Sequence, residues 1–154
     1  MNLNEHARHL GGLLANLQSL ELLIRVYLSK QPGARSIGPV GTDIFSHPVG
    51  TIVPESDMTS YDSLTQLITK FNLSMEQQGK PIIDTSLIAL RDALAHGRIS
   101  ADLADENLRL VKYDKPINGN VRVSFNAQMT EHWFSSNKVR VLEAMALVHA
   151  EMQP

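Results

Sequence analysis

The sequence predicts a mainly α-helical domain that carries one small β-hairpin before its last helix. Apolar residues recur at helical spacing in four segments, and two alternating β-branched runs flank the turn-forming pair Asn118 and Gly119. The chain has 154 residues, of which 43% are hydrophobic and 19% charged, as in an ordinary globular protein. We therefore expect residues 1–154 to fold as a single domain.

The first segment predicts a long amphipathic helix from Leu3 to about Ser29. Its apolar residues fall every three or four positions, and no proline interrupts them. Gly11 and Gly12 lie inside it, where each glycine costs about 1 kcal/mol relative to alanine. The pair indicates either a close helix crossing or a local weak point, and we favour the crossing.

Residues 31–58 predict a long irregular loop. They hold four of the seven prolines and four of the nine glycines, residues that interrupt regular structure. Loops of this length are uncommon inside a compact domain, and they are usually mobile, functional or packed over another surface. Short strands around Ile44 or Ile52 remain an alternative within the loop.

Two further helices are predicted after the loop. Thr59 or Ser60 can cap a second helix over residues 60–77. A third begins directly after Pro81, a residue favoured in first helical turns, and ends at Gly97. Because Gly97 follows the last helical residue, we expect it to adopt the left-handed conformation that closes many helices.

Residues 108–126 predict the β-hairpin. Its strands are Leu108–Tyr113 and 121–125, and Asn118 and Gly119 favour a tight turn between them. A last helix then begins after Thr130 or Ser135 and runs almost to Pro154. Together the segments predict a four-to-five-helix bundle with one hairpin and a long loop after the first helix.

The composition narrows the functional classes. Without cysteine there is no disulfide or cysteine zinc site, and the histidines are scattered, so we expect no metal and no cofactor. The sequence shows no signal-peptide pattern and no membrane-length apolar run, so we expect a cytoplasmic protein without a membrane partner. The net charge of −2 gives no global positive field, so any nucleic-acid contact must be local.

The segment that suggests chemistry closes the predicted third helix and contains Arg91, Asp92 and His96. At about 100° per residue, Asp92 and His96 lie roughly 40° apart, so the carboxylate can orient the imidazole. Arg91 lies roughly 140° from His96, so one copy of the motif spreads over a wide helix face. Histidine and arginine suit RNA cleavage by the ribose 2′-hydroxyl without a metal, since they supply acid–base groups and hold phosphate charge.

This segment resembles the signature of the HEPN superfamily, in which an arginine is followed a few residues later by a histidine, late in a helix of a helical bundle. Arg91 and His96 match the two signature positions, and Asp92 matches the polar residue that often follows the arginine. The predicted order of helices, with the motif closing the third, is also similar. The resemblance implies an HEPN-like bundle over most of the chain.

The resemblance also implies a function. HEPN ribonucleases work as homodimers in which two motifs form one composite site, so it implies a homodimeric, metal-independent endoribonuclease for single-stranded RNA. His96 would be the acid or base, Arg91 would hold the phosphate, and Asp92 would position them. A toxin or defence role, with an antitoxin or another protein as partner, would fit such an enzyme.

Three basic residues after the motif are candidates for RNA binding, namely Arg98, Arg109 and Lys112. Residues 108–126 hold four basic residues against one acidic residue, a local charge of +3. Over residues 98–126 the balance is five against four, or +1, so a solvated hairpin face is the alternative interpretation.

The motif of Arg91, Asp92 and His96 also has other interpretations. His96 followed by Gly97 is also a simple helix end, where the helix dipole favours an imidazolium. A non-catalytic helical module for oligomerisation or partner binding is therefore an alternative function, with the loop over residues 31–58 as a candidate interface. Nucleotide binding, with Arg91 and Arg98 on a phosphate, is a third.

Overall fold

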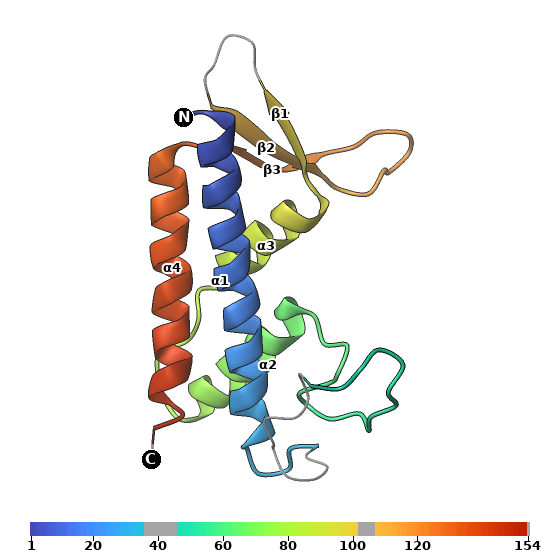
Figure 1. The fold of residues 1–154 in the computed structure, drawn as a ribbon, viewed down its shortest axis with the longest axis vertical. Coiled ribbons are helices and arrows are strands. Elements are labelled where there is room, and N and C mark those ends of the chain that lie inside the picture. The colour runs from blue at the N-terminus through green and yellow to red at the C-terminus, as the bar shows by residue number, and fades with distance from the viewer. Residues whose placement is uncertain (36–45, 102–106, 154) are drawn as a thin grey trace.

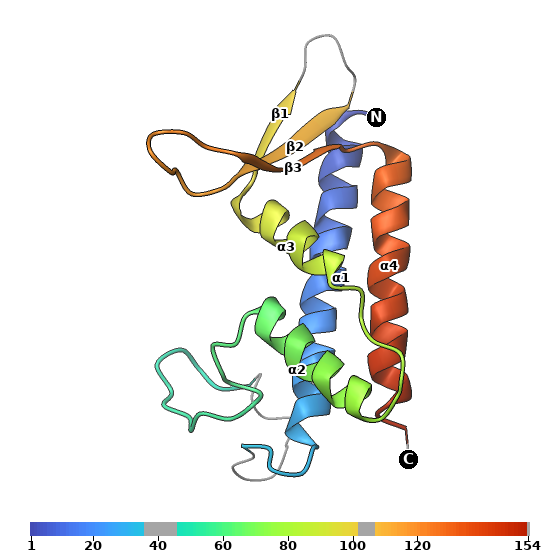
Figure 2. The ribbon, with the colours of Figure 1, turned by 180° about the vertical axis from the view of Figure 1, so that it is seen from behind.

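Four helices and a three-stranded antiparallel sheet make up the described chain, which is residues 1–35, 46–101 and 107–153 of a computed structural model. Helices α1 (Leu3–Ser29) and α4 (Glu131–Ala150) run side by side in the same direction (Figure 1). Helices α2 (Leu64–Gln77) and α3 (Ser86–His96) lie against α1 on its other side (Figure 2). The predicted mainly α class is confirmed.

Helix α1 has the bounds that its periodicity predicts. Asn2 begins it, because its side chain accepts a hydrogen bond from the backbone N–H of Glu5 while the Glu5 carboxylate accepts one from the backbone N–H of Asn2. The expected helix crossing at Gly11 and Gly12 is wrong for the described chain, since a Cβ at either position would meet no atom within 4 Å.

The described part of the long loop, residues 31–35 and 46–58, contains turns and neither helix nor strand. Ile52 lies in no strand, and Ile44 lies outside the described residues. The loop continues to Ser63, whose hydroxyl caps α2 by accepting a hydrogen bond from the N–H of Gln66. The prediction that Thr59 or Ser60 caps this helix is therefore wrong.

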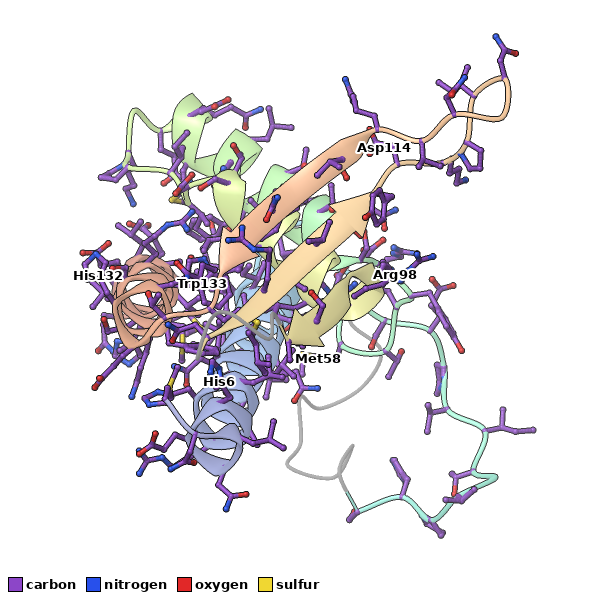
Figure 3. The ribbon with its side chains drawn as sticks, turned by 90° about the horizontal axis from the view of Figure 1, so that it is seen from above. His6, Met58, Arg98, Asp114, His132 and Trp133 are labelled. Atoms are coloured by element: carbon purple, nitrogen blue, oxygen red, sulfur yellow. The ribbon has the colours of Figure 1, made fainter. Side chains whose placement is uncertain are left out.

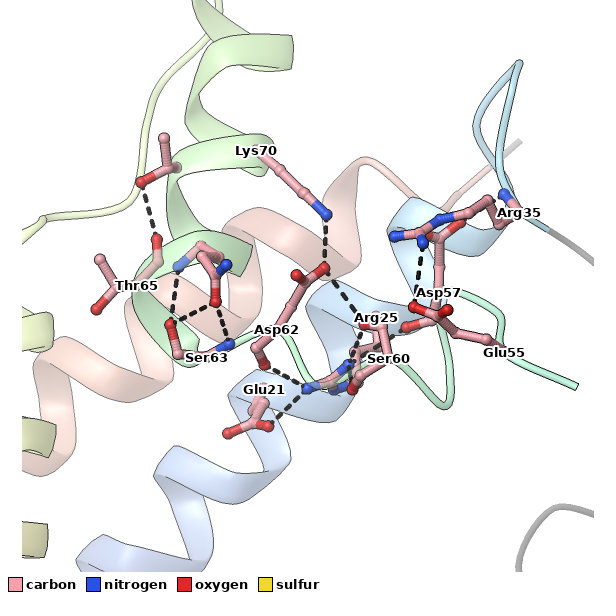
Figure 4. Close-up of polar contacts among 12 residues, drawn as sticks. Glu21, Arg25, Arg35, Glu55, Asp57, Ser60, Asp62, Ser63, Thr65 and Lys70 are labelled. Carbon is pink, nitrogen blue, oxygen red and sulfur yellow. Dashed lines mark hydrogen bonds and ion pairs between the residues drawn. The ribbon is translucent and has the colours of Figure 1, made fainter. Parts of the chain in front are cut away.

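Arg25 of α1 explains where the loop ends (Figure 4). Its guanidinium donates hydrogen bonds to the backbone oxygens of Ser60 and Asp62, at 3.0 and 2.6 Å, and to Glu21 of the same helix at 3.0 Å. Lys70 of α2 pairs with the Asp62 carboxylate and holds the pKa of that carboxyl below its usual range. The arginine thus holds the non-helical segment before α2 against α1.

Helix α3 begins at Ser86, later than the predicted start directly after Pro81. Asn72 of α2 is the reason: its amide donates to the backbone oxygen of Ile83 and accepts from the N–H of the same residue, both at 2.8 Å. Ile83 is fully buried in this non-helical segment. Asp84 then accepts a hydrogen bond from the N–H of Ser86 at 2.9 Å, which satisfies a donor in the first turn.

The sheet differs from the predicted hairpin by one strand. Strands β2 (Leu108–Tyr113) and β3 (Val123–Gln128) pair as a hairpin, and β1 (Arg98–Ala101) pairs with the other edge of β2. The turn between β2 and β3 is as predicted, since Asn118 and Gly119 have positive φ angles of 51° and 77°. The predicted strand 121–125 is displaced, since β3 begins two residues later, at Val123, and ends three residues later, at Gln128.

The sheet lies at the end of the molecule where α1 and α4 begin and α3 ends (Figures 1 and 3). Leu110 of β2 is buried and joins the cluster of core side chains contributed by all four described helices.

The last helix has Thr130 as its N-cap and ends at Ala150, while Pro154 lies outside the described residues. Among residues 1–35, 46–101 and 107–153, no helix is long and apolar enough to cross a membrane.

Candidate active site at the end of helix α3

Helix α3 ends at His96, and Gly97 turns the chain directly into β1. The expected left-handed conformation of Gly97 is wrong, since its φ of −75° and ψ of 175° are extended. Glycine is required there for space: a Cβ would lie 2.4 Å from the backbone oxygen of Ala93 and 2.8 Å from Cδ1 of Leu110. The close contact with Leu110 fixes the end of α3 against β2.

Asp92 lies between two basic side chains at this helix end. Its Oδ2 is 3.0 Å from Nζ of Lys112 on β2, and its Oδ1 is 3.8 Å from Nε2 of His96. The side chain of His96 is 66% exposed, whereas that of Lys112 is only 19% exposed. We call Asp92, His96 and Lys112 the Asp92 cluster. It presents an accessible imidazole beside a carboxylate that a lysine holds in place.

Arg91 lies apart from the Asp92 cluster. It lines a hollow of about 240 Å³ between α3 and α1, together with Gln18 and Glu21 of α1 and Ala95 of α3. This placement agrees with the roughly 140° that separates positions five apart on a helix. One copy of the chain therefore keeps the arginine and the histidine of the motif on different sides of α3.

The other predicted binding residues lie on the sheet. Arg98 stands over the ring of Tyr113, with Cζ 5.5 Å from the ring centroid, and Arg109 donates to Oδ1 of Asn126 at 2.9 Å. Lys112 is separated from these arginines, because it alternates to the other face of β2 and pairs with Asp92. Arg98 thus lies among residues of the sheet, whereas Arg91 lines the hollow between α3 and α1.

The cluster can exchange protons and balance charge. Imidazole is the side-chain group that most often serves as a general acid or base in enzymes, and that of His96 is exposed. Within residues 1–35, 46–101 and 107–153, no three His, Asp or Glu side chains gather to form a metal site. The role of Lys112 beside Asp92 was not predicted from the sequence, because the two residues lie on different elements and no local pattern joins them.

No protein-family model, curated protein or solved structure matches the chain significantly.

Proposed function

We propose that the chain is an HEPN-like, metal-independent endoribonuclease that cleaves single-stranded RNA as a homodimer. The observation that supports this most is the Asp92 cluster, in which an exposed histidine closes a helix beside an oriented carboxylate. The match of Arg91, Asp92 and His96 to the HEPN signature adds to it.

The proposed reaction needs two proton transfers and no co-reactant. A base removes the proton of a ribose 2′-hydroxyl, and the oxygen attacks the adjacent phosphorus while an acid protonates the departing 5′-oxygen. The bond between phosphorus and the 5′-oxygen breaks, which leaves a 2′,3′-cyclic phosphate and a 5′-hydroxyl. A cation near the phosphate stabilises the charge that develops on its oxygens.

A homodimer would supply these groups from two copies. One copy offers one His96, and its Arg91 faces the α1 side of the helix. A two-fold axis close to the end of α3 would bring two copies of His96 around one phosphate, one as base and one as acid, with Arg91 of either copy as the cation. Asp92 then positions His96, and Lys112 holds Asp92.

Analysis of the RNA ends tests this proposal. Purified protein is incubated with labelled single-stranded RNA in EDTA, and the cleaved position is then replaced by a 2′-deoxyribonucleotide. We expect cleavage of the all-ribose RNA to 2′,3′-cyclic phosphate ends, and no cleavage at the deoxy position because the nucleophile is missing. Equal cleavage of both RNAs, or complete dependence on added metal, would rule the mechanism out.

A non-catalytic binding module is the second candidate, and one specific observation favours it. Residues 114–122 between β2 and β3, which we call the arm, and the loop over residues 46–62 project from the same side of the molecule (Figures 1 and 2). Both carry exposed apolar side chains, with Ile117 on the arm 73% exposed and Ile52 on the loop 97% exposed. Such projections suit docking of a second copy or of a protein partner such as an antitoxin. Inertness toward several RNAs, with intact binding of a partner, would favour this function.

A further inference from the structure

The two faces of the sheet differ sharply. Leu110 of β2 points toward the helices and is 1% exposed. Directly paired residues of an antiparallel ladder share a face and alternate along each strand. The register pairs Arg98 with Val111 and Ser100 with Arg109, which places these four residues on the face opposite Leu110.

The opposite face continues onto β3. Arg109 also pairs with Gln128, and Val111 pairs with Asn126, so β3 adds polar side chains to the same side. Tyr113 follows Val111 by two positions and is 41% exposed. We call Arg98, Ser100, Arg109, Tyr113 and Asn126 the open sheet face. Figure 3 looks down on the sheet from the side away from the helices.

The charge of the open sheet face is positive within the described chain. Arg98 contacts the ring of Tyr113, and Arg109 contacts the neutral Asn126, so no described carboxylate pairs with either guanidinium. Two neighbouring cations, in contrast, have carboxylate partners. Lys112 pairs with Asp92, and Arg122 pairs with Asp114 and holds the pKa of that carboxyl below its usual range. The two arginines of the open sheet face thus have no described carboxylate partner that a phosphate would have to displace.

The aromatic ring makes this surface more than a charged patch. The guanidinium of Arg98 lies over one face of the Tyr113 ring, and flat aromatic and guanidinium groups are the surfaces on which unpaired bases stack. A face of three strands is about 10 Å wide, which gives room for two or three nucleotides. A duplex hides its bases and cannot use such a surface in this way.

We infer that the open sheet face binds unpaired RNA, with bases stacking on Tyr113 and Arg98 and phosphates meeting Arg98 and Arg109. This inference rests on the proposed function for its choice of RNA, and it adds the surface that holds the substrate. Only Gly97 separates Arg98 from His96 in the sequence, so the end of β1 that carries Arg98 is the end that adjoins α3.

The experiment measures binding without cleavage. His96→Ala protein is titrated into a short fluorescein-labelled oligouridylate, and affinity is followed by anisotropy over a range of salt concentrations. Tyr113→Ala, Tyr113→Phe, Arg98→Gln and Arg109→Gln are each added to this parent. Lys115→Gln is the matched control, because Lys115 is an exposed cation on the arm outside the open sheet face. Thermal melting verifies that every variant is folded.

We expect Tyr113→Ala to weaken binding by roughly 5- to 150-fold, the usual effect of losing one stacked base. Tyr113→Phe should bind like the parent because it keeps the ring. Arg98→Gln and Arg109→Gln should each reduce the slope of log affinity against log salt by about 0.7, the value for one phosphate contact on a single strand. Lys115→Gln should leave the slope unchanged, and a double-stranded RNA should compete poorly.

The inference and the proposed function can fail separately. Equal affinities for the parent and all sheet variants, equal competition by duplex RNA, or no binding by the parent would overturn the inference. If wild type nevertheless cleaves RNA, the proposed ribonuclease function still holds. RNA binding that depends on Tyr113, Arg98 and Arg109, together with a wild type that cannot cleave RNA, would support the inference and rule out the proposed ribonuclease activity.

Discussion

Lys112 of β2 reaches Asp92 of α3, with its Nζ 3.0 Å from Oδ2 of the carboxylate. The contact joins the sheet to the helix that ends at His96. It also turns the lysine away from the open sheet face, where Arg98 and Arg109 lie.

Lys112→Met removes this contact while keeping most of the apolar stem. Because Asp92 is 44% exposed, solvent screens the pair, and we expect the free energy of unfolding to fall by less than about 1 kcal/mol. The salt dependence of RNA binding should not change, unlike that of Arg98→Gln. Urea denaturation and anisotropy measure the two effects, and a reduced salt slope would place Lys112 among the RNA contacts instead.

Gly97→Ala should be strongly destabilising. The added Cβ would overlap the backbone oxygen of Ala93 and Cδ1 of Leu110, and overpacking of this kind costs roughly 1–3 kcal/mol. Gly12→Ala is the matched control, because nothing lies within 4 Å of its Cβ and alanine favours a helix by about 1 kcal/mol. We expect opposite shifts in the urea midpoint. A stabilised Gly97→Ala protein would show that α3 and β2 do not approach as closely as described.

Asn72→Ala should weaken the connection between α2 and α3. The change leaves the N–H and the oxygen of Ile83 buried without their partner, at a cost of roughly 1–3 kcal/mol for each group. Asn120→Ala, in the exposed arm, should change stability by less than about 0.5 kcal/mol. Denaturation of both variants in urea checks this, and equal midpoints would contradict the buried role of Asn72.

Asp84 gives the chain an acid-sensitive contact. Hydrogen bonds from Ser86, helped by Arg140, lower the pKa of Asp84 from 3.8 to about 2. A carboxyl whose pKa is lower in the folded state stabilises the fold above its unfolded pKa and loses this contribution as the pH falls from about 4 to 2. Because the side chain is 56% exposed, we expect at most about 1 kcal/mol.

Asp84→Asn tests this pH dependence. The difference in unfolding free energy between wild type and variant should be largest above pH 4 and should shrink toward pH 2. Urea denaturation at several pH values measures it. A difference that stays constant over this range would mean that Asp84 does not titrate with a lowered pKa.

The sequence predicts those elements whose signals are local. Helix α1 follows its apolar repeat, α4 begins at one of the two predicted caps, Thr130, and the tight turn at Asn118 and Gly119 lies where the sequence favours it. The angular separation of Arg91 from His96 also follows from helix geometry alone, and the structure agrees with it.

Elements set by distant contacts were not predictable in this way. The start of α2 depends on Arg25, which binds the chain at Ser60, and the start of α3 depends on the bond between Asn72 and Ile83. Strand β1 has only four residues and is exposed along its whole length, so its local sequence signal is too short to reveal it. Its place is fixed by its pairing with β2, as is the approach of Lys112 to Asp92.

The measurement that tests the central claim most directly is the rate of RNA cleavage in EDTA by wild type and by His96→Ala at equal folding and equal dimer content. His149→Ala is the matched control, since His149 is also an exposed histidine in the last turn of a helix. The account predicts that His96→Ala lowers the rate by roughly 10²- to 10⁴-fold, as loss of a general acid or base does, and that His149→Ala cleaves like wild type. Equal rates for wild type and His96→Ala would contradict it.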